Sequence, residues 1–260
     1  MSSSQHWYCA TTGQPRYTTI GKNGKERNTT VRDARDGSLV PSVSTINGLL
    51  SKAGLNQYFQ RMAIQATLDH AKWEGESNED YIKRLLELAK EDSRKAAERG
   101  TAIHDILDSY FSCVYAPEWP NYVHRIKECL DKTFGNRLWL SEKSFAHPEG
   151  YGGKVDLYSK PDPINNLPGI VIDFKTTEKD PGELTPYYEH TLQLAAYREG
   201  LVPGAFCANI FVNGNTNEIS LKMHTEQELR DGYESFLKIG RATSELQSLA
   251  YLVCRLLLEK

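Results

Sequence analysis

The chain has 260 residues, which is long enough to bury a sizeable hydrophobic core. Its content of 39% hydrophobic and 25% charged residues is typical of a soluble globular protein. The formal net charge of −3 excludes a protein that attracts nucleic acid through a basic charge spread over its whole surface, so any such binding requires local basic patches.

The sequence also argues against several cofactor and membrane classes. Its five scattered cysteines include no CxxC pair, which argues against a disulfide framework, a zinc site and an iron–sulfur cluster, and favours a reducing cytoplasm. MSSSQHWYC has no apolar run, so we predict no signal peptide. The most apolar segment, residues 249–258, is too short to span a bilayer, so no membrane partner is expected. No GxxxxGK phosphate loop is present, and we expect no nucleotide cofactor.

Residues 1–40 form a polar, turn-rich arm in which aromatic and basic side chains are interleaved. Trp7 and Tyr17 are aromatic examples, and Arg32 and Arg35 are basic ones. Two interpretations stay open. The arm is either a solvated hairpin or a segment that contacts a nucleic-acid backbone and stacks a base.

A helical region follows the arm. Residues 41–50 predict a turn and a short helix capped by Ser42 or Ser44. Residues 57–73 have helical spacing, and Asn78 is the predicted cap of the next helix.

A long helix is predicted over residues 92–114, with Gly100 inside it at a cost of about 1 kcal/mol relative to alanine. His104 lies one turn after Gly100 on the same face, and Asp108 lies one turn beyond. A small residue beside a histidine leaves room for a ligand or for a closely packed strand. A structural role and a metal-binding role for His104 therefore both stay open.

Apolar alternation predicts three strands in the next part of the chain, over residues 138–145, 153–158 and 169–175. Side chains alternate between the two faces of a strand, so Asp173 and Lys175 point away from Ile172. If the second and third strands are neighbours, Asp156 can join Asp173 and Lys175 on one side of the sheet.

Two converging carboxylates repel each other unless a cation lies between them, and hard oxygen ligands suit Mg²⁺ or Mn²⁺. Lys175 is within reach of whatever the metal binds, for which a phosphate is the best candidate. An ordinary surface ion pair between Asp173 and Lys175 is the alternative. The apolar run IVI that leads into Asp173 favours a functional site, because charges at the end of a buried strand are costly.

The remaining elements are a helix over residues 186–199, strands over 205–212 and 218–224, and C-terminal helices that begin at the capping signature of Thr225 and Glu228. This order predicts an α/β (α+β) fold with a mixed central sheet flanked by helices. We expect one domain, consisting of a basic arm (1–40), a helical part (41–135), core strands (136–225) and C-terminal helices (226–260).

Five short motifs in this order resemble the RecB-type branch of the PD-(D/E)XK nuclease superfamily, which includes phage exonucleases and the mitochondrial genome maintenance exonuclease. They are PSVSTI (41–46), RGTAIH ending at His104, GGKVD ending at Asp156, the triplet 173–175 (DFK) and QLAAY (193–197). The similarity covers residues 41–200. The chain departs from the iron–sulfur branch, because the C-terminal cysteine cluster is missing, and from the helicase–nuclease fusions, because no motor is attached.

The resemblance implies a site that holds one or two Mg²⁺ or Mn²⁺ ions. Asp156 and Asp173 would bind the metal, with the backbone carbonyl of Phe174 completing the shell. His104 resembles the additional ligand of this family, and Glu142 matches a glutamate sometimes found on the preceding strand.

The resemblance also assigns roles at the scissile phosphate. Lys175 would activate the attacking water, and Gln193 and Tyr197 resemble the QxxxY element that orients the lysine and contacts DNA. Further candidates for DNA contact are Thr176, Ser44, Arg32 and Arg35.

The expected function is therefore a metal-dependent DNA exonuclease that acts from DNA ends in replication, recombination or repair. Its substrate would be single-stranded DNA or a duplex with an end, and a recombination or replication protein could be its partner. The expected location is the cytoplasm, which is that of the host if the gene belongs to a phage. A flap- or junction-cutting endonuclease and a non-catalytic DNA-binding module are the alternatives.

Overall fold

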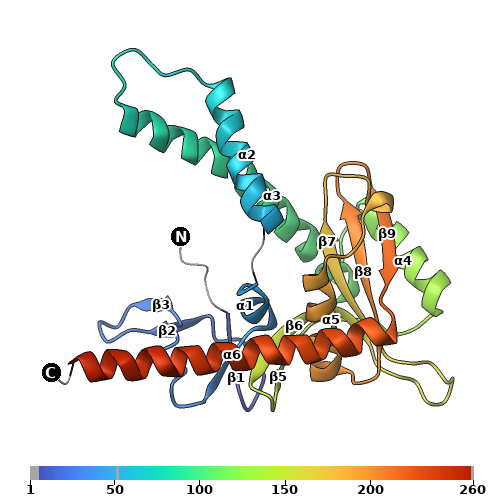
Figure 1. Ribbon diagram of the computed structural model, residues 1–260. Helices are drawn as coiled ribbons and strands as arrows, with labels where there is room; N and C mark the ends of the chain where they lie inside the picture. The colour runs from blue at the N-terminus through green and yellow to red at the C-terminus, as the bar shows by residue number, and fades with distance from the viewer. Residues whose placement is uncertain (1–5, 51–52, 259–260) are drawn as a thin grey trace. The chain divides into compact units, whose positions relative to one another are not determined.

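The computed structural model describes residues 6–50 and 53–258 (Figure 1). The chain divides into two compact units, one formed by Met1–Leu49 with Leu107–Lys260 and the other by Leu50–Ile106.

The first unit is built on a five-stranded mixed sheet, which confirms the predicted fold class (Figure 1). Its strands, in spatial order, are β5 (Leu140–His147), β6 (Tyr151–Ser159), β7 (Ile170–Thr176), β8 (Phe206–Asn213) and β9 (Glu218–Met223). The strands β7 and β8 are parallel, whereas all other neighbours are antiparallel. Parallel neighbours need a crossover connection, and here it contains the 3₁₀ turn η1 (Pro181–Glu183) and the helix α5 (Tyr188–Leu201).

Helices cover both faces of this sheet. The helix α5 lies against β5 to β8, while α4 (Asn121–Phe134) lies against β8 and β9 (Figure 1). Strand β8 is buried from Cys207 to Asn213, as expected for a strand with both faces covered. The C-terminal helix α6 (Glu226–Leu258) lies against α5.

The helix starts are partly as predicted. Thr225 and Glu228 form the expected capping box, in which each side chain accepts a hydrogen bond from the backbone N–H of the other, at 2.7 and 3.2 Å. The helix α5 begins at Tyr188 rather than at Pro186, because Tyr187 is its N-cap and donates its N–H to His190 Nδ1.

The N-terminal arm folds into two small sheets. Strand β1 (Trp7–Cys9) pairs with β4 (Leu39–Pro41), and β2 (Thr18–Ile20) pairs with β3 (Glu26–Asn28). The short helix α1 (Val43–Asn47) is capped by Ser42, whose hydroxyl accepts a hydrogen bond from Thr45 N at 2.9 Å. Trp7 and Tyr8 are buried, so they stabilise the fold rather than offer a surface to a ligand.

The second unit contains α2 (Ala53–Asp69) and most of α3 (Asn78–Phe111). The sequence predicted that a new helix over 92–114 follows the one capped by Asn78, but α3 is continuous. Ser77, not Asn78, caps it, because Ser77 Oγ accepts a hydrogen bond from Asp80 N at 3.1 Å. None of the helices that the structure describes is sufficiently long and apolar to cross a membrane.

Candidate active site

The pairing of the central sheet is interrupted around Asp156. The β5–β6 ladder omits Glu142 and Asp156, the two residues that its register places opposite each other. The β6–β7 ladder ends one position before Asp156 and Asp173 would pair. Asp156 Oδ2 instead accepts a hydrogen bond from the backbone N–H of Phe174 at 2.8 Å. The carboxylate of Asp156 is thereby fixed beside the residues that follow Asp173.

Glu142 has a backbone conformation that is unusual for a strand. Its φ of 53° lies in the left-handed region, which costs a residue other than glycine about 1 kcal/mol or more. Its carboxylate forms an ion pair with Lys154 of β6. The structure thus places the predicted ligand Glu142 opposite Asp156 in the register, with a lysine as its immediate partner.

The structure brings four other predicted residues into one hydrogen-bonded chain. Asp173 is 1% exposed, and its Oδ2 lies 2.8 Å from Lys175 Nζ. Lys175 donates to Gln193 Oε1 at 3.0 Å, and Gln193 Nε2 donates to the hydroxyl of Tyr197 at 2.9 Å. The spacing of four residues between Gln193 and Tyr197 on α5 places both side chains on the same side of that helix.

The charges of this chain act on each other. Burial lowers the pKa of Lys175, but the carboxylates of Asp173, Asp156 and Glu189 outweigh it, so the pKa is raised above its usual value. Burial raises the pKa of Tyr197 far above its usual value, and the negative charges of Asp156 and Asp173 raise it further. At neutral pH Lys175 is therefore a cation and Tyr197 a neutral hydrogen-bonding group.

A buried polar relay behind Asp173 was not predicted from the sequence. Asn209 is fully buried on β8 and donates its Nδ2 to Asp173 Oδ2 at 2.7 Å. Its Oδ1 must then act as an acceptor, which assigns the proton of the 2.8 Å contact to His224 Nε2. His224 Nδ1 lies 3.3 Å from the hydroxyl of Thr191 on α5. Burial lowers the pKa of His224, which favours a neutral ring with its proton on Nε2.

One signal for Asn209 was present in the sequence. It is the only polar residue in the apolar run 205–212 (AFCANIFV), and a buried amide needs a partner. The partner could not be named without the register, in which Asp173 pairs with Asn209 across the parallel strands β7 and β8.

The motif residue Gly153 is explained by close packing. A Cβ atom at this position would lie 2.7 Å from Cε1 of Tyr197 and 3.0 Å from the ring of Phe145. Only glycine therefore lets the Tyr197 ring approach strand β6 at this point.

The donor set fits a hard divalent cation. Two aspartates and the carbonyl oxygen of Phe174 belong to adjacent strands, and their negative charge raises the pKa of both Lys175 and Tyr197. Oxygen donors of this kind suit Mg²⁺ and Mn²⁺. Within the part of the chain that the structure describes, no three His, Cys, Asp or Glu side chains form a metal-binding cluster. The donors that would hold the ion here are therefore the two aspartates and the carbonyl oxygen of Phe174.

The remaining predicted residues lie outside the hydrogen-bonded chain. His104 is half-buried on the part of α3 that belongs to the second unit, and its predicted role as a ligand stays a prediction. Thr176 is exposed at the end of β7, and Ser44 is exposed on α1, with its hydroxyl 2.9 Å from that of Ser42.

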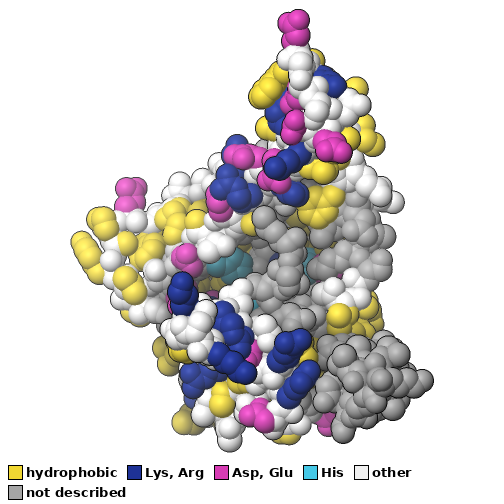
Figure 2. All heavy atoms as spheres, turned by 90° about the vertical axis from the view of Figure 1, so that its left-hand side faces the viewer, with side chains coloured by type: hydrophobic (Ala, Val, Ile, Leu, Met, Phe, Trp, Pro, Cys, Tyr) yellow, Lys and Arg dark blue, Asp and Glu magenta, His cyan; other side chains and the backbone are white. Residues whose placement is uncertain are grey.

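Arg32 and Arg35 are exposed, and they follow the hairpin β2–β3 within the N-terminal arm. Figure 2 shows lysine and arginine side chains gathered in this part of the surface. Residues 16–36 contain six cations and three anions, so the arm has a positive excess although the whole chain is negative. Contacts with the phosphates of a nucleic acid would require a local excess of positive charge of this kind.

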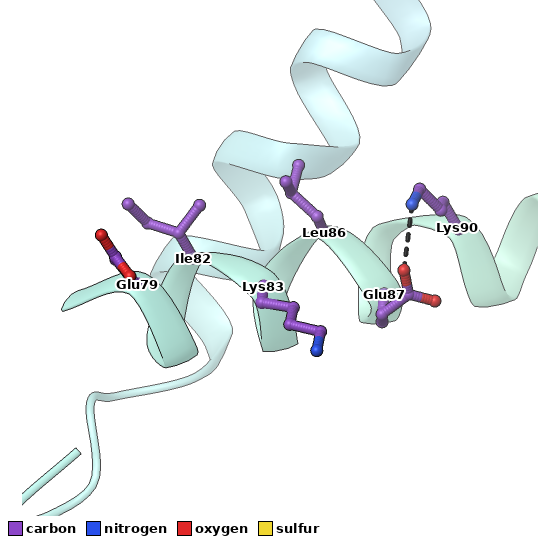
Figure 3. Close-up of a pocket in the computed structure, with 6 residues that line it drawn as sticks. All are labelled: Glu79, Ile82, Lys83, Leu86, Glu87 and Lys90. Atoms are coloured by element: carbon purple, nitrogen blue, oxygen red, sulfur yellow. Dashed lines mark hydrogen bonds and ion pairs between the residues drawn. The ribbon is translucent and has the colours of Figure 1, made fainter. Parts of the chain in front are cut away.

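A surface depression in the second unit is separate from this chemistry. Its lining residues all come from one side of α3 and are Glu79, Ile82, Lys83, Leu86, Glu87 and Lys90 (Figure 3). Ile82 and Leu86 are about half exposed, and Lys90 pairs with Glu87 at 3.0 Å. An exposed ion pair and two aliphatic residues on one helix offer no group that could perform a reaction.

Comparison of the sequence with known family models and with curated proteins gives no match. Among solved structures, the chain is similar to the one described as the crystal structure of SSO0001, with a TM-score of 0.35 and 15% sequence identity over 75% of this chain and 87% of the other.

Proposed function

We propose that this chain is a divalent-metal-dependent DNA exonuclease of the PD-(D/E)XK type. The observation that carries the proposal is the convergence of Asp156, Asp173 and Lys175 where the pairing of β6 with β7 ends. The motif resemblance adds that such a trio acts on polynucleotides.

Each residue of the site has a defined task in this proposal. Asp156 and Asp173 would hold Mg²⁺ or Mn²⁺, which supplies a nucleophile at neutral pH and charge stabilisation at the phosphate. Lys175, which is positively charged and held by Gln193, would orient the attacking water and offset negative charge at the scissile phosphate. Tyr197 is neutral and would hold Gln193 in place.

The test compares end-labelled linear and circular single-stranded DNA, each incubated with the protein in Mg²⁺, Mn²⁺ or EDTA. The expected result is metal-dependent loss of the linear substrate alone. Asp173→Asn keeps the size of the side chain but removes its charge, and it should abolish the loss. A matched control is Asp162→Asn, which changes a half-buried loop aspartate whose carboxylate accepts hydrogen bonds from Ile164 and Asn165 of its own turn.

The other outcomes separate the alternatives. Cutting of the circle would replace the exonuclease by an endonuclease. DNA binding without cutting of linear, circular or duplex substrates in any metal would indicate a binding module and would refute the proposed catalysis.

A further inference from the structure

Two aromatic side chains of the N-terminal arm form a stacked pair. The rings of His6 and Tyr17 have centroids 4.6 Å apart and an interplanar angle of 31°. Both residues are half-buried, so part of each side chain faces solvent. The Tyr17 hydroxyl also forms a hydrogen bond with that of Tyr8 at 2.9 Å, and the two rings meet edge to face.

The central sheet holds this pair in place. His6 is anchored by its backbone, because its carbonyl accepts a hydrogen bond from Ser42 N at 2.9 Å and its N–H donates to Thr45 Oγ1 at 3.3 Å. Ser42 forms a parallel bridge with Gly152 of β6, and a Cβ at Gly152 would lie 2.8 Å from the side chain of Tyr8. The arm is therefore packed directly on the strand that carries Asp156.

Strand pairing places the arm near the candidate active site, because Ser42 bridges to Gly152 of β6, four residues before Asp156 on the same strand. The hydroxyl of Tyr17 contributes to the raised pKa of Tyr197, after the larger effects of burial, Asp156 and Asp173. Burial and then the positive charge of Lys154 lower the pKa of His6, so its ring is neutral at neutral pH. Lys154 is the partner of Glu142, the residue opposite Asp156 in the register. The stacked pair thus belongs to the segment of the arm that packs on β6, the strand that carries Asp156.

Tyr17 also marks the start of the basic patch. It directly precedes β2, and its carbonyl accepts a hydrogen bond from Thr29 N at 2.9 Å at the base of the hairpin β2–β3. The exposed cations of this patch are Arg16, Lys22, Lys25, Arg27, Arg32 and Arg35 (Figure 2). Aromatic rings next to a row of cations are the combination with which proteins bind single strands, through base stacking and phosphate contacts.

We propose that the His6–Tyr17 pair is a stacking subsite for one unpaired nucleobase next to the scissile phosphate, and that single-stranded DNA is therefore the substrate. A base inside a duplex is stacked on its neighbours and has no free face for this pair. The inference rests on the proposed function and deepens it, because it selects one of the two expected substrate classes.

The test uses single-stranded oligonucleotides that carry the fluorescent base 2-aminopurine at one position at a time, bound in EDTA so that no cleavage occurs. Stacking on an aromatic ring quenches this base. The expected result is quenching at one or two neighbouring positions. Tyr17→Leu should remove it and weaken binding about 5- to 150-fold, whereas Tyr17→Phe, which keeps the ring, should retain it.

Two further variants keep the test decisive. His6→Ala removes the other ring but leaves the backbone bonds of residue 6, and it should also reduce the quenching. Tyr115→Leu changes a tyrosine that is 89% exposed elsewhere in the same unit and should have no effect. Wild-type binding without quenching, or full quenching and wild-type affinity in both Tyr17→Leu and His6→Ala, would overturn the subsite.

The subsite and the proposed function fail in different ways. DNA degradation without position-specific quenching would remove the subsite and leave the exonuclease. Quenching that depends on Tyr17, in a protein that degrades no DNA, would keep the subsite and refute the exonuclease.

Discussion

Asn209 offers a sharp test of how the site is held together. Its amide donates to Asp173 Oδ2 at 2.7 Å and accepts from His224 at 2.8 Å, and all three residues are less than 10% exposed. Asn209→Ala removes a hydrogen bond to a buried charge, worth about 1.5–3 kcal/mol, and leaves the His224 N–H without its acceptor. Water that enters the space left by the amide recovers part of the loss. We therefore expect unfolding to become easier by about 2–4 kcal/mol.

The assay is urea unfolding in EDTA, followed by circular dichroism. With an m-value of about 3 kcal/mol/M, the expected loss lowers the unfolding midpoint by about 1 M. Cleavage is measured separately at a temperature where the variant is fully folded, and it should fall because Asp173 Oδ2 keeps Lys175 but loses its bond to Asn209.

Asn213→Ala is the matched control. Asn213 is equally buried on β8, but it binds Lys179 O and the turn residues Asn215 and Thr216 rather than Asp173. It should lower stability and leave the cleavage rate of the folded protein unchanged. An unchanged midpoint in Asn209→Ala, or an equal loss of cleavage in Asn213→Ala, would refute the reasoning.

Three other results are expected. Lys175→Ala should abolish cleavage while DNA binding, measured by fluorescence anisotropy, persists; surviving cleavage would remove Lys175 from the mechanism. Gly153→Ala should cost about 1–3 kcal/mol of stability in urea unfolding, because its Cβ would lie 2.7 Å from Tyr197. A stability equal to that of the wild type would show that the Tyr197 ring moves freely. Burial and then Lys175 lower the pKa of His190 from 6.5 to about 4, so the unfolded state takes up a proton first as the pH falls. The free energy of unfolding should therefore fall by about 3 kcal/mol as the pH is lowered from 6.5 to 4. Urea unfolding measured across this pH range should show a smaller fall in His190→Gln.

The fold was predictable wherever local patterns were strong. Alternation placed the strands β6 and β7 within two residues of their observed limits, and the Thr225–Glu228 signature placed the start of α6. The break expected near residue 90 was wrong, because no helix-breaking residue occurs there. Exposed ion pairs continue along the surface of α3 at this point, and they are Lys90 with Glu87, Lys95 with Glu91 and Arg94 with Glu98.

The site was predictable only in its local part. Asp173 and Lys175 are two residues apart, and Gln193 and Tyr197 are four apart, so strand and helix periodicity alone places each pair on one side of its element. Asn209 is far from Asp173 in the sequence, and its contact depends on the parallel register of β7 and β8. The packing of the arm on β6 likewise depends on a bridge between distant segments. Such long-range pairings leave no periodic signal in the sequence.

The features of the central sheet that reduce its folding stability lie together at this site, and a need for stability does not explain why they are there. A left-handed Glu142, a ladder that stops at Asp156 and a carboxylate buried at Asp173 all oppose folding. Lys175 and Asn209 offset the buried charge, but well-packed apolar residues often stabilise a buried position as well as an ion pair does. A polar residue that lowers stability, at a position where an apolar residue would raise it, is expected where that polar residue is needed for chemistry. This is the physical reason for which we propose the carboxylates of β6 and β7, rather than the depression on α3, as the place of the reaction.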